Sequence, residues 1–262
     1  MRLLKRLKCT LKYEKLAWAD GAKLIAGVDE VGRGSLFGPV VAGAVILEPD
    51  YRIRGLRDSK LLDQPTREKL AERIKEHAIA YAVAAVDVAR IDQMNIYHAS
   101  LLAMREAIAH LAPAPDHLLI DAVRVDWQCP QTNIIHGDAV SASIAAASII
   151  AKVERDAMIC RWAAVYPEYD LASNKGYRSP KHLTALRDYG PTPLHRQSFA
   201  PVWMAAVPQQ KFAFMDEDLE EDWADEVVED VTEETERMAA TTGEEVVQDN
   251  FDPDTTEKLG VE

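Results

Sequence analysis

The chain has 262 residues, of which 48% are hydrophobic and 28% are charged, so it is long enough to bury a sizeable core. No apolar run is long enough to cross a bilayer. Basic and apolar residues alternate over positions 1–8, unlike the continuous hydrophobic stretch of a secretory signal. Cys9, Cys129 and Cys160 form no Cys-x-x-Cys pair, which argues against a zinc knuckle or a disulfide framework. We therefore expect a soluble cytoplasmic protein with reduced thiols and no membrane partner.

The formal net charge of −13 is unevenly distributed along the chain. Residues 216–262 contain 20 acidic and 2 basic residues, which leaves 28 basic and 23 acidic residues, a net charge of +5, for positions 1–215. A basic body suits a polyanionic partner. The acidic segment has no sustained apolar period, so burial would not offset its chain entropy, and we expect residues 208–262 to form a disordered acidic tail.

Apolar patterns in the basic body predict alternating strands and helices. The first two strands are joined by a short glycine-containing turn, which favours an antiparallel pair. A long helix over residues 139–165 is rich in Ala and Ser, a composition that suits close packing on a sheet. The expected strands cover residues 24–29, 40–47, 79–88, 117–121 and 132–136, and the other expected helices cover residues 66–77 and 92–111.

Two adjacent carboxylates, Asp29 and Glu30, end the first apolar strand and precede a turn in which Arg33 lies between Gly32 and Gly34. Carboxylate oxygens are the ligands that hard divalent cations prefer. The glycines allow positive φ and a close approach of backbone amides to an anion, while arginine supplies a forked donor. The pattern predicts a metal and phosphate site. The alternative is an acidic strand end followed by an ordinary glycine turn.

A second apolar strand ends at Asp121, and Gly137 and Asp138 directly precede the long helix. Two strand ends that carry carboxylates predict a shared cleft. Because neighbouring strand residues point to opposite faces, Asp29 and Asp121 rank above Glu30, which reaches the same ion only if the strand bends or through its main-chain carbonyl. Asp138 is also a candidate N-cap of the following helix, and both roles can coexist.

The segment over residues 174–178 mixes cations, a glycine and an aromatic ring. Lys175 and Arg178 suit a backbone phosphate, and Tyr177 suits packing against a sugar or a base. The alternative is a plain surface turn.

Motifs spread over residues 24–202 resemble, in the same order, those of the bacterial ribonuclease HII family. The opening block, GVDEVGRG at 27–34 followed by GPVVAGAV at 38–45, is the most extensive early match. The later matching blocks are LRDSK at 56–60, NI at 95–96, LID at 119–121, GD at 137–138, SIAAASIIAKVERD at 143–156, KGY at 175–177 and SFAPV at 198–202. The joint order of these blocks is far more specific than any one of them.

The resemblance implies an α/β protein with an RNase H-like fold, in which helices flank a central mixed β-sheet and a small helical C-terminal region follows. It implies a catalytic domain of the ribonuclease HII type, which we expect over residues 24–207, between a basic N-terminal extension over residues 1–23 and the acidic tail over residues 208–262. A monomeric cytoplasmic enzyme is expected.

The implied reaction is hydrolysis of the RNA strand in RNA–DNA hybrids, including single ribonucleotides embedded in duplex DNA, giving 3′-hydroxyl and 5′-phosphate ends. Such an enzyme supports RNA primer removal and ribonucleotide excision repair. Two divalent ions, Mn²⁺ or Mg²⁺, about 4 Å apart would activate water and stabilise the leaving oxygen. By motif, the catalytic and metal-binding set is Asp29, Glu30, Asp121 and Asp138; the RNA-to-DNA junction is read by Gly32, Arg33, Gly34 and Tyr177; and Lys60 contacts a phosphate.

The chain departs from the family pattern at Ser35 and Phe37, where Pro and Ala are common. We expect a differently packed turn and preserved catalysis, because neither change removes a carboxylate or a glycine.

Three other functions compete with this interpretation. A protein that binds hybrids without cutting them would have a broken acidic set, whereas all four matching carboxylates are present. Ribonuclease HIII has an added N-terminal substrate-binding domain, and only about 24 residues precede the first expected strand here. A metal-dependent phosphotransferase would use a Gly-Lys-Ser/Thr nucleotide loop, which this sequence lacks.

The acidic tail lies outside the resemblance. Its simplest interpretation is a solvated extension without function, and the alternative is an internal mimic of nucleic acid that visits the basic body. Residues 210–214, QKFAF, faintly resemble a sliding-clamp peptide and suggest a weak clamp contact. The alternative there is a hinge segment that packs on the body.

Overall fold

A computed structural model describes residues 7–206 of the chain, which belong to the first of its two units, residues 1–208. The predictions for the acidic tail and for residues 210–214 lie outside the described residues. Among the helices of residues 7–206, none combines the length and the hydropathy that a bilayer span requires. Cys9, Cys129 and Cys160 are free thiols, as the sequence predicts.

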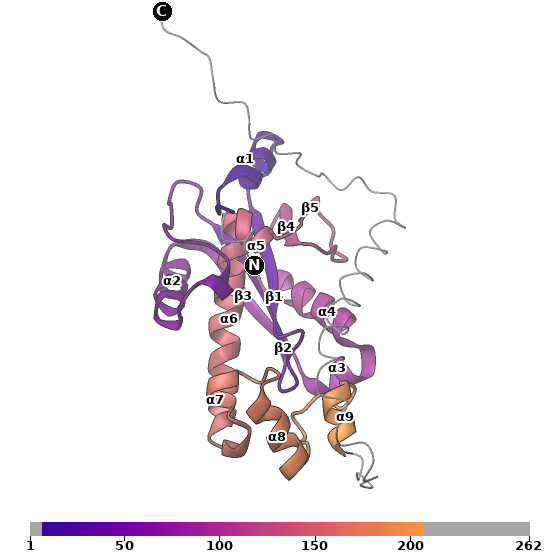
Figure 1. The fold of residues 1–262 in the computed structure, drawn as a ribbon. Coiled ribbons are helices and arrows are strands. Elements are labelled where there is room, and N and C mark those ends of the chain that lie inside the picture. Colours follow the sequence, from indigo (N-terminus) through magenta and orange to yellow (C-terminus); the bar gives the residue numbers. More distant parts are fainter. Residues whose placement is uncertain (1–6, 207–262) are drawn as a thin grey trace, which may run out of the picture. The chain divides into compact units, whose positions relative to one another are not determined.

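Five strands form one mixed sheet in the order β3-β2-β1-β4-β5 (Figure 1). The β1–β2 and β2–β3 pairs are antiparallel, whereas the β1–β4 and β4–β5 pairs are parallel. The antiparallel pairing predicted for the first two strands is therefore confirmed, and the carboxyl ends of β1 and β4 lie next to each other. The strands are β1 (Ile25–Val31), β2 (Val40–Leu47), β3 (Ala78–Val86), β4 (His117–Asp121) and β5 (Gln131–Ile134).

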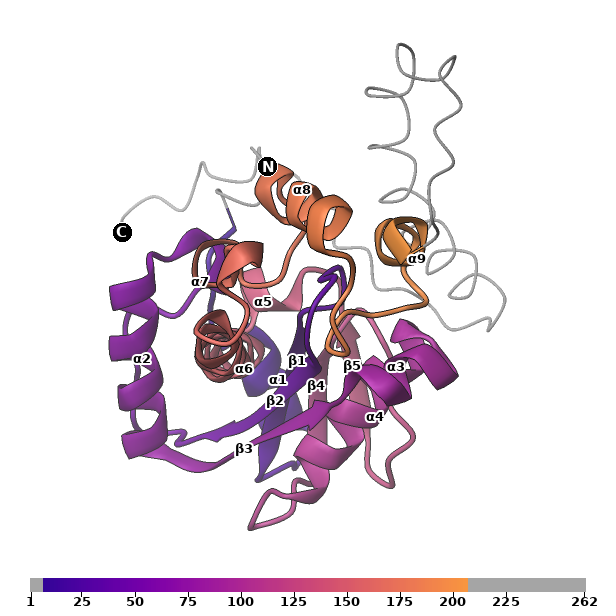
Figure 2. The same cartoon turned by 90° about the horizontal axis from the view of Figure 1, so that it is seen from below.

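Helices cover both faces of this sheet (Figure 2). Ala26 and Val28 share a core cluster with residues of α4 (Ile96–Ala109) on one face. The alternate residue Gly27 faces α6 (Ala142–Ala163), where an added Cβ would lie 2.0 Å from the carbonyl carbon of Ser143. The backbone of α6 therefore lies directly on β1, as the Ala- and Ser-rich sequence predicts, and α2 (Gln64–His77) packs against α6.

The remaining helices are short. The C-terminal ones surround a separate apolar cluster that includes Phe37, Tyr169, Leu186 and Val202, which confirms the expected small helical region. Together, the shorter elements are α1 (Lys12–Ala19), η2 (Ser59–Leu61), α3 (Val88–Met94), α5 (Gly137–Val140), η3 (Pro167–Tyr169), α7 (Leu171–Asn174), α8 (Pro180–Tyr189) and α9 (Ala200–Ala206).

Two helix predictions were wrong in detail. The single helix expected over residues 92–111 is split into α3 and α4 at Asn95, which has a φ of 71° and whose side chain accepts a hydrogen bond from the amide of His98. The long helix is capped by Ser141, which accepts a hydrogen bond from the amide of Ile144. Asp138 is therefore not the N-cap of the long helix and lies inside α5 instead.

Candidate active site

Three of the four predicted carboxylates gather where β1 and β4 end. Val28 of β1 pairs with Ile120 of β4. Asp29 and Asp121, the next residue of each strand, therefore lie on neighbouring parallel strands at the same level. The amide of Gly137 donates a 2.8 Å hydrogen bond to Oδ1 of Asp121, which holds α5 and its Asp138 against the end of β4. Asp29 and Asp138 are buried, each with 6% of its surface exposed.

The electrostatics of these carboxyl groups place them in one site. Burial raises the pKa of Asp29 well above its usual value, and the charges of Glu30, Asp121 and Asp138 raise it further. Burial, followed by the charge of Asp138, raises the pKa of Asp121 to about 7, although the hydrogen bond from Gly137 opposes the shift. The protein thus holds like charges together in a desolvated place.

Lys60 belongs to the same site. Burial alone would lower the pKa of the Lys60 ammonium group, but Asp138, Asp29, Asp58 and Asp121 together raise it. The amide of Lys60 donates a 2.8 Å hydrogen bond to Oδ1 of Asp58, which caps the short helix η2. The Asp-Ser-Lys block therefore delivers a cation to the edge of the carboxylate cluster.

The sequence analysis did not identify two polar residues of this cluster, Asp58 and Ser148. Burial raises the pKa of Asp138, and the charge of Asp58 and a hydrogen bond between the two carboxyl groups raise it further. Ser148 of α6 lowers the pKa of Asp29, and its hydroxyl lies 2.9 Å from that of Ser59. Asp58 and Ser148 both lie in sequence blocks that match the family, so the resemblance could have identified them.

Glu30 is the fourth predicted carboxylate, and its side chain, whose charge acts on Asp29 and Asp121, is paired with Arg33. Oε1 of Glu30 lies 3.2 Å from Nη1 of Arg33 in an ion pair. Within residues 7–206, no three acidic, histidine or cysteine side chains are already grouped so that they could hold one ion. The donor set nevertheless fits a hard divalent cation, because its oxygens carry negative charge that the protein leaves poorly compensated.

Two fully buried arginines hold the glycine turn that follows β1. Arg196 donates from Nη1 to the carbonyl oxygen of Arg33 at 2.6 Å and from Nη2 to that of Gly32 at 2.7 Å. Arg155 occupies the space beside Gly32, where an added Cβ would lie 2.2 Å from Nε. Gly34 differs, because nothing lies within 4 Å of the Cβ position there. Gly32 therefore serves internal packing, and Gly34 leaves bare backbone open to a ligand.

Tyr177 lies beside this turn. It forms a backbone bridge with Ser35, and its ring lies 5.3 Å from Nζ of Lys152 and 5.2 Å from Cζ of Arg155. These cations follow Ser148 on α6 by four and seven residues, which corresponds to about 6–10 Å along the helix. Tyr177 and the carboxylates thus lie along the same face of α6.

The two departures from the family pattern are both packed into the structure. Oγ of Ser35 accepts a 2.7 Å hydrogen bond from Nη2 of Arg155 and donates one of 2.9 Å to the carbonyl oxygen of Phe37. The buried ring of Phe37 packs edge-on against His195, with 5.0 Å between ring centroids. Ser35 thereby gives Arg155 an acceptor inside the turn.

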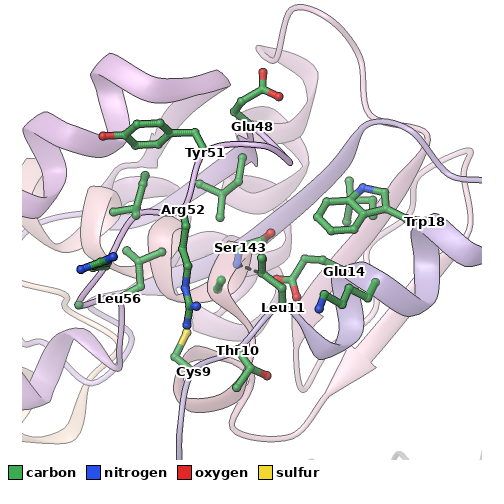
Figure 3. Close-up of a pocket in the computed structure, with 17 residues that line it drawn as sticks. Cys9, Thr10, Leu11, Glu14, Trp18, Glu48, Tyr51, Arg52, Leu56 and Ser143 are labelled. Carbon is green, nitrogen blue, oxygen red and sulfur yellow. Dashed lines mark hydrogen bonds between the residues drawn. The ribbon is translucent and has the colours of Figure 1, made fainter.

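A cavity of about 480 Å³ lies away from this cluster, between α1 and the loop over residues 48–56 (Figure 3). Glu14 lines it and ties α1 to the start of α6, since its Oε1 accepts 2.8 Å hydrogen bonds from the Ser141 hydroxyl and the Ser143 amide. None of the four predicted carboxylates lines this cavity. Burial and the charges of Glu14 and Asp138 raise the pKa of Cys9 on its rim to about 12, which favours the protonated thiol over the nucleophilic thiolate.

The sheet order, with carboxylates on the adjacent ends of β1 and β4 and helices on both faces, is that of the RNase H-like fold. The family model described as Ribonuclease HII matches residues 26–202. The Ribonuclease HII of Koribacter versatilis (strain Ellin345) is 72% identical over 215 residues, which cover 82% of this chain and 85% of the relative. The chain belongs to the ribonuclease HII family and is an enzyme of the ribonuclease H type.

Solved structures share this fold. The crystal structure of ribonuclease H2 from Pyrococcus horikoshii OT3 matches with a TM-score of 0.60 and 27% identity, covering 70% of this chain and 97% of the other. The RNase HII in the PCNA:RNase HII complex from Archaeoglobus fulgidus matches with a TM-score of 0.59 and 25% identity, covering 71% and 98%. The fold prediction made from the sequence is confirmed.

Proposed function

We propose that this enzyme hydrolyses the RNA strand of RNA–DNA hybrids and also cuts at single ribonucleotides embedded in duplex DNA, leaving 3′-hydroxyl and 5′-phosphate ends. The observation that carries the proposal is the gathering of Asp29, Asp121, Asp138 and Lys60 at the ends of β1 and β4. Removal of RNA primers and excision of misincorporated ribonucleotides in the cytoplasm are the proposed cellular tasks.

Asp29, Glu30, Asp121 and Asp138 would hold the two divalent ions, Mg²⁺ or Mn²⁺. Bound ions would lower the pKa of the attacking water and stabilise negative charge on the leaving oxygen. Glu30 would have to share its carboxylate with Arg33 to take part, since the two side chains are paired. Lys60, beside Asp138, is suited to a phosphate of the strand, because its ammonium group is a compact point charge.

The ribose 2′-hydroxyl distinguishes RNA from DNA at a single position. Gly34 is the part of the turn best suited to meet it, because its backbone lacks a neighbouring side chain. Tyr177 would then pack against the following deoxyribose, which favours a ribonucleotide-to-deoxyribonucleotide step. Replacing Tyr177 with alanine is expected to impair cutting at a lone ribonucleotide selectively, and equal activity of variant and parent on that substrate would reject the role.

A monomer is proposed to act on these substrates, with a weak sliding-clamp contact as a further partner. The support for a clamp is the QKFAF segment together with the solved structure of an archaeal RNase HII in complex with PCNA. Loss of a pull-down by purified clamp when residues 210–214 are replaced by alanine would support the contact. Equal retention of both proteins would reject this route of binding.

One experiment tests reaction, substrate and cofactor together. The full chain is incubated with a long RNA–DNA hybrid or with duplex DNA containing one ribonucleotide, in Mg²⁺ and in Mn²⁺, and the ends of the products are identified. We expect both substrates to be cut with 3′-hydroxyl ends and the activity to be lost in Asp29→Asn. Binding of hybrid without metal-dependent cutting, or full activity of Asp29→Asn, would contradict the proposal.

A further inference from the structure

Two buried histidines are in direct contact behind Tyr177. His182 lies on α8 and His195 in the segment that precedes α9, and both are fully shielded from solvent. Their Nε2 atoms lie 3.0 Å apart, so one of them must carry the proton and the other must accept it.

Their neighbours decide which ring donates. The backbone amide of Thr192 lies 3.0 Å from Nδ1 of His195 and can only donate, so Nδ1 is an acceptor and the proton of His195 is on Nε2. His195 therefore donates to Nε2 of His182. The proton of His182 is then on Nδ1, which donates a 3.0 Å hydrogen bond to the carbonyl oxygen of Tyr177. A directional relay runs from Thr192 through both rings to Tyr177.

The relay requires both rings to be neutral, because a second proton would set two N–H groups against each other. Burial, followed by the charge of His182, lowers the pKa of His195 to about 3. Burial also lowers the pKa of His182, against the effect of its bond to Tyr177. The protein therefore keeps both rings in the state that the hydrogen bonds need.

The segment that carries His195 also holds the glycine turn. The amide of Gly38 donates a 2.9 Å hydrogen bond to the carbonyl oxygen of Leu194, and Arg196 binds the carbonyl oxygens of Gly32 and Arg33. Residues 194–196 thus contact the turn directly and reach Tyr177 through His182. This one short segment therefore contacts both groups that are proposed to recognise the RNA-to-DNA junction, the glycine turn and Tyr177.

We propose that His182 and His195 are positioning residues that set Tyr177 relative to the turn at Gly32–Gly34 and thereby determine the preference for a ribonucleotide-to-deoxyribonucleotide step. This inference rests on the proposed function of Tyr177. Neither histidine touches the substrate. Each acts through the carbonyl group of Tyr177, whose amide is held separately by a 3.0 Å bond to the carbonyl oxygen of Asn174. Small displacements of a positioning group are costly to catalysis.

A pair of substitutions at His182 separates the two ends of the relay. Asparagine places an amide near the position of Nδ1 and can keep the bond to Tyr177, whereas glutamine reaches the position of Nε2 and can keep only the bond to His195. The quantity to measure is the ratio of kcat/KM on duplex DNA with one ribonucleotide to kcat/KM on a long hybrid. His182→Gln is expected to lower this ratio about five- to tenfold, the size of one lost hydrogen bond, and His182→Asn to lower it less.

Controls keep folding and function apart. His195→Asn is a second variant that interrupts the relay, thermal melting reports folding, and His110→Gln at an exposed position should change neither the ratio nor the melting temperature. In a Tyr177→Ala background, His182→Gln should lower the ratio no further.

An unchanged ratio in Tyr177→Ala alone would overturn the role of Tyr177 and the relay with it. A second outcome would overturn the relay only. In that outcome Tyr177→Ala changes the ratio, but folded His182→Gln and His195→Asn lose the same activity on both substrates. If His182→Gln does not fold, His195→Asn decides. An unchanged ratio in folded His195→Asn overturns the relay, and a lowered ratio supports the relay.

Discussion

Gly32 and Gly34, which are separated by one residue, are expected to respond differently to substitution by alanine. At Gly32, φ is +92° and an added Cβ would lie 2.2 Å from Nε of the fully buried Arg155. The left-handed backbone costs an alanine about 1–2 kcal/mol, and overpacking a filled core costs about 1–3 kcal/mol. Gly32→Ala should therefore lose about 2–5 kcal/mol of folding stability.

At Gly34 the same substitution meets open space, and the backbone there is outside the left-handed region. Gly34→Ala should change stability by less than about 0.5 kcal/mol, the range of ordinary surface substitutions. Its cutting of a lone ribonucleotide should nevertheless fall, because a methyl group would stand where the proposed 2′-hydroxyl contact is made.

Thermal melting of the full chain checks the stability of both variants, and single-turnover cutting checks their activity. A loss of about 2–5 kcal/mol corresponds to a melting temperature lowered by about 4–20 °C in a domain of this size. The reasoning is refuted if Gly32→Ala melts with the parent protein. It is equally refuted if Gly34→Ala is as destabilised as Gly32→Ala.

Three further predictions concern the site and its support. Because the pKa of Asp121 is raised from 3.8 to about 7 in the folded chain, the metal-free native state binds more protons than the unfolded state between these values. Its free energy of unfolding should fall as pH rises from about 4 to 7, by at most about 4 kcal/mol. Denaturant melts at several pH values should show a weaker dependence of this free energy on pH in Asp121→Asn. Arg196→Lys should lose about 2–4 kcal/mol, since an ammonium group cannot replace the guanidinium bonds to two turn carbonyls; an unchanged urea midpoint would contradict this. Ser35→Ala should lose about 1–3 kcal/mol in the same melts, because Nη2 of Arg155 loses its 2.7 Å acceptor and keeps only the 3.2 Å bond to the carbonyl oxygen of Phe37; an unchanged urea midpoint would contradict this.

The sequence predicted the parts of the fold that depend on local pattern. An apolar run ending in Asp29, a glycine turn and a second apolar run were enough for the β1–β2 pair, and the same logic found β4 and Asp121. Asn95 was not recognised as a helix break, because the apolar pattern continues across it. Its positive φ and the capping of α4 by its side chain are visible only in the structure.

The residues that hold the site together were harder to predict. The sequence analysis did not single out Arg155 or Arg196, and only the folded chain shows that their buried guanidinium groups bind carbonyl groups between β1 and β2. The contact between His182 and His195 joins residues thirteen positions apart through a hydrogen bond that no periodicity indicates. Burial with satisfied hydrogen bonds is a property of tertiary packing, so sequence patterns alone do not reveal it.

The central claim is that Asp29 and Asp121 bind divalent ions together. Titration calorimetry with Mn²⁺ near pH 7 tests it directly, without substrate, in the parent protein and in Asp29→Asn and Asp121→Asn. We expect the parent to bind two ions and release protons, since ion binding favours the charged carboxylates, and each variant to lose affinity or one ion. Equal stoichiometry and affinity in all three proteins would contradict the account.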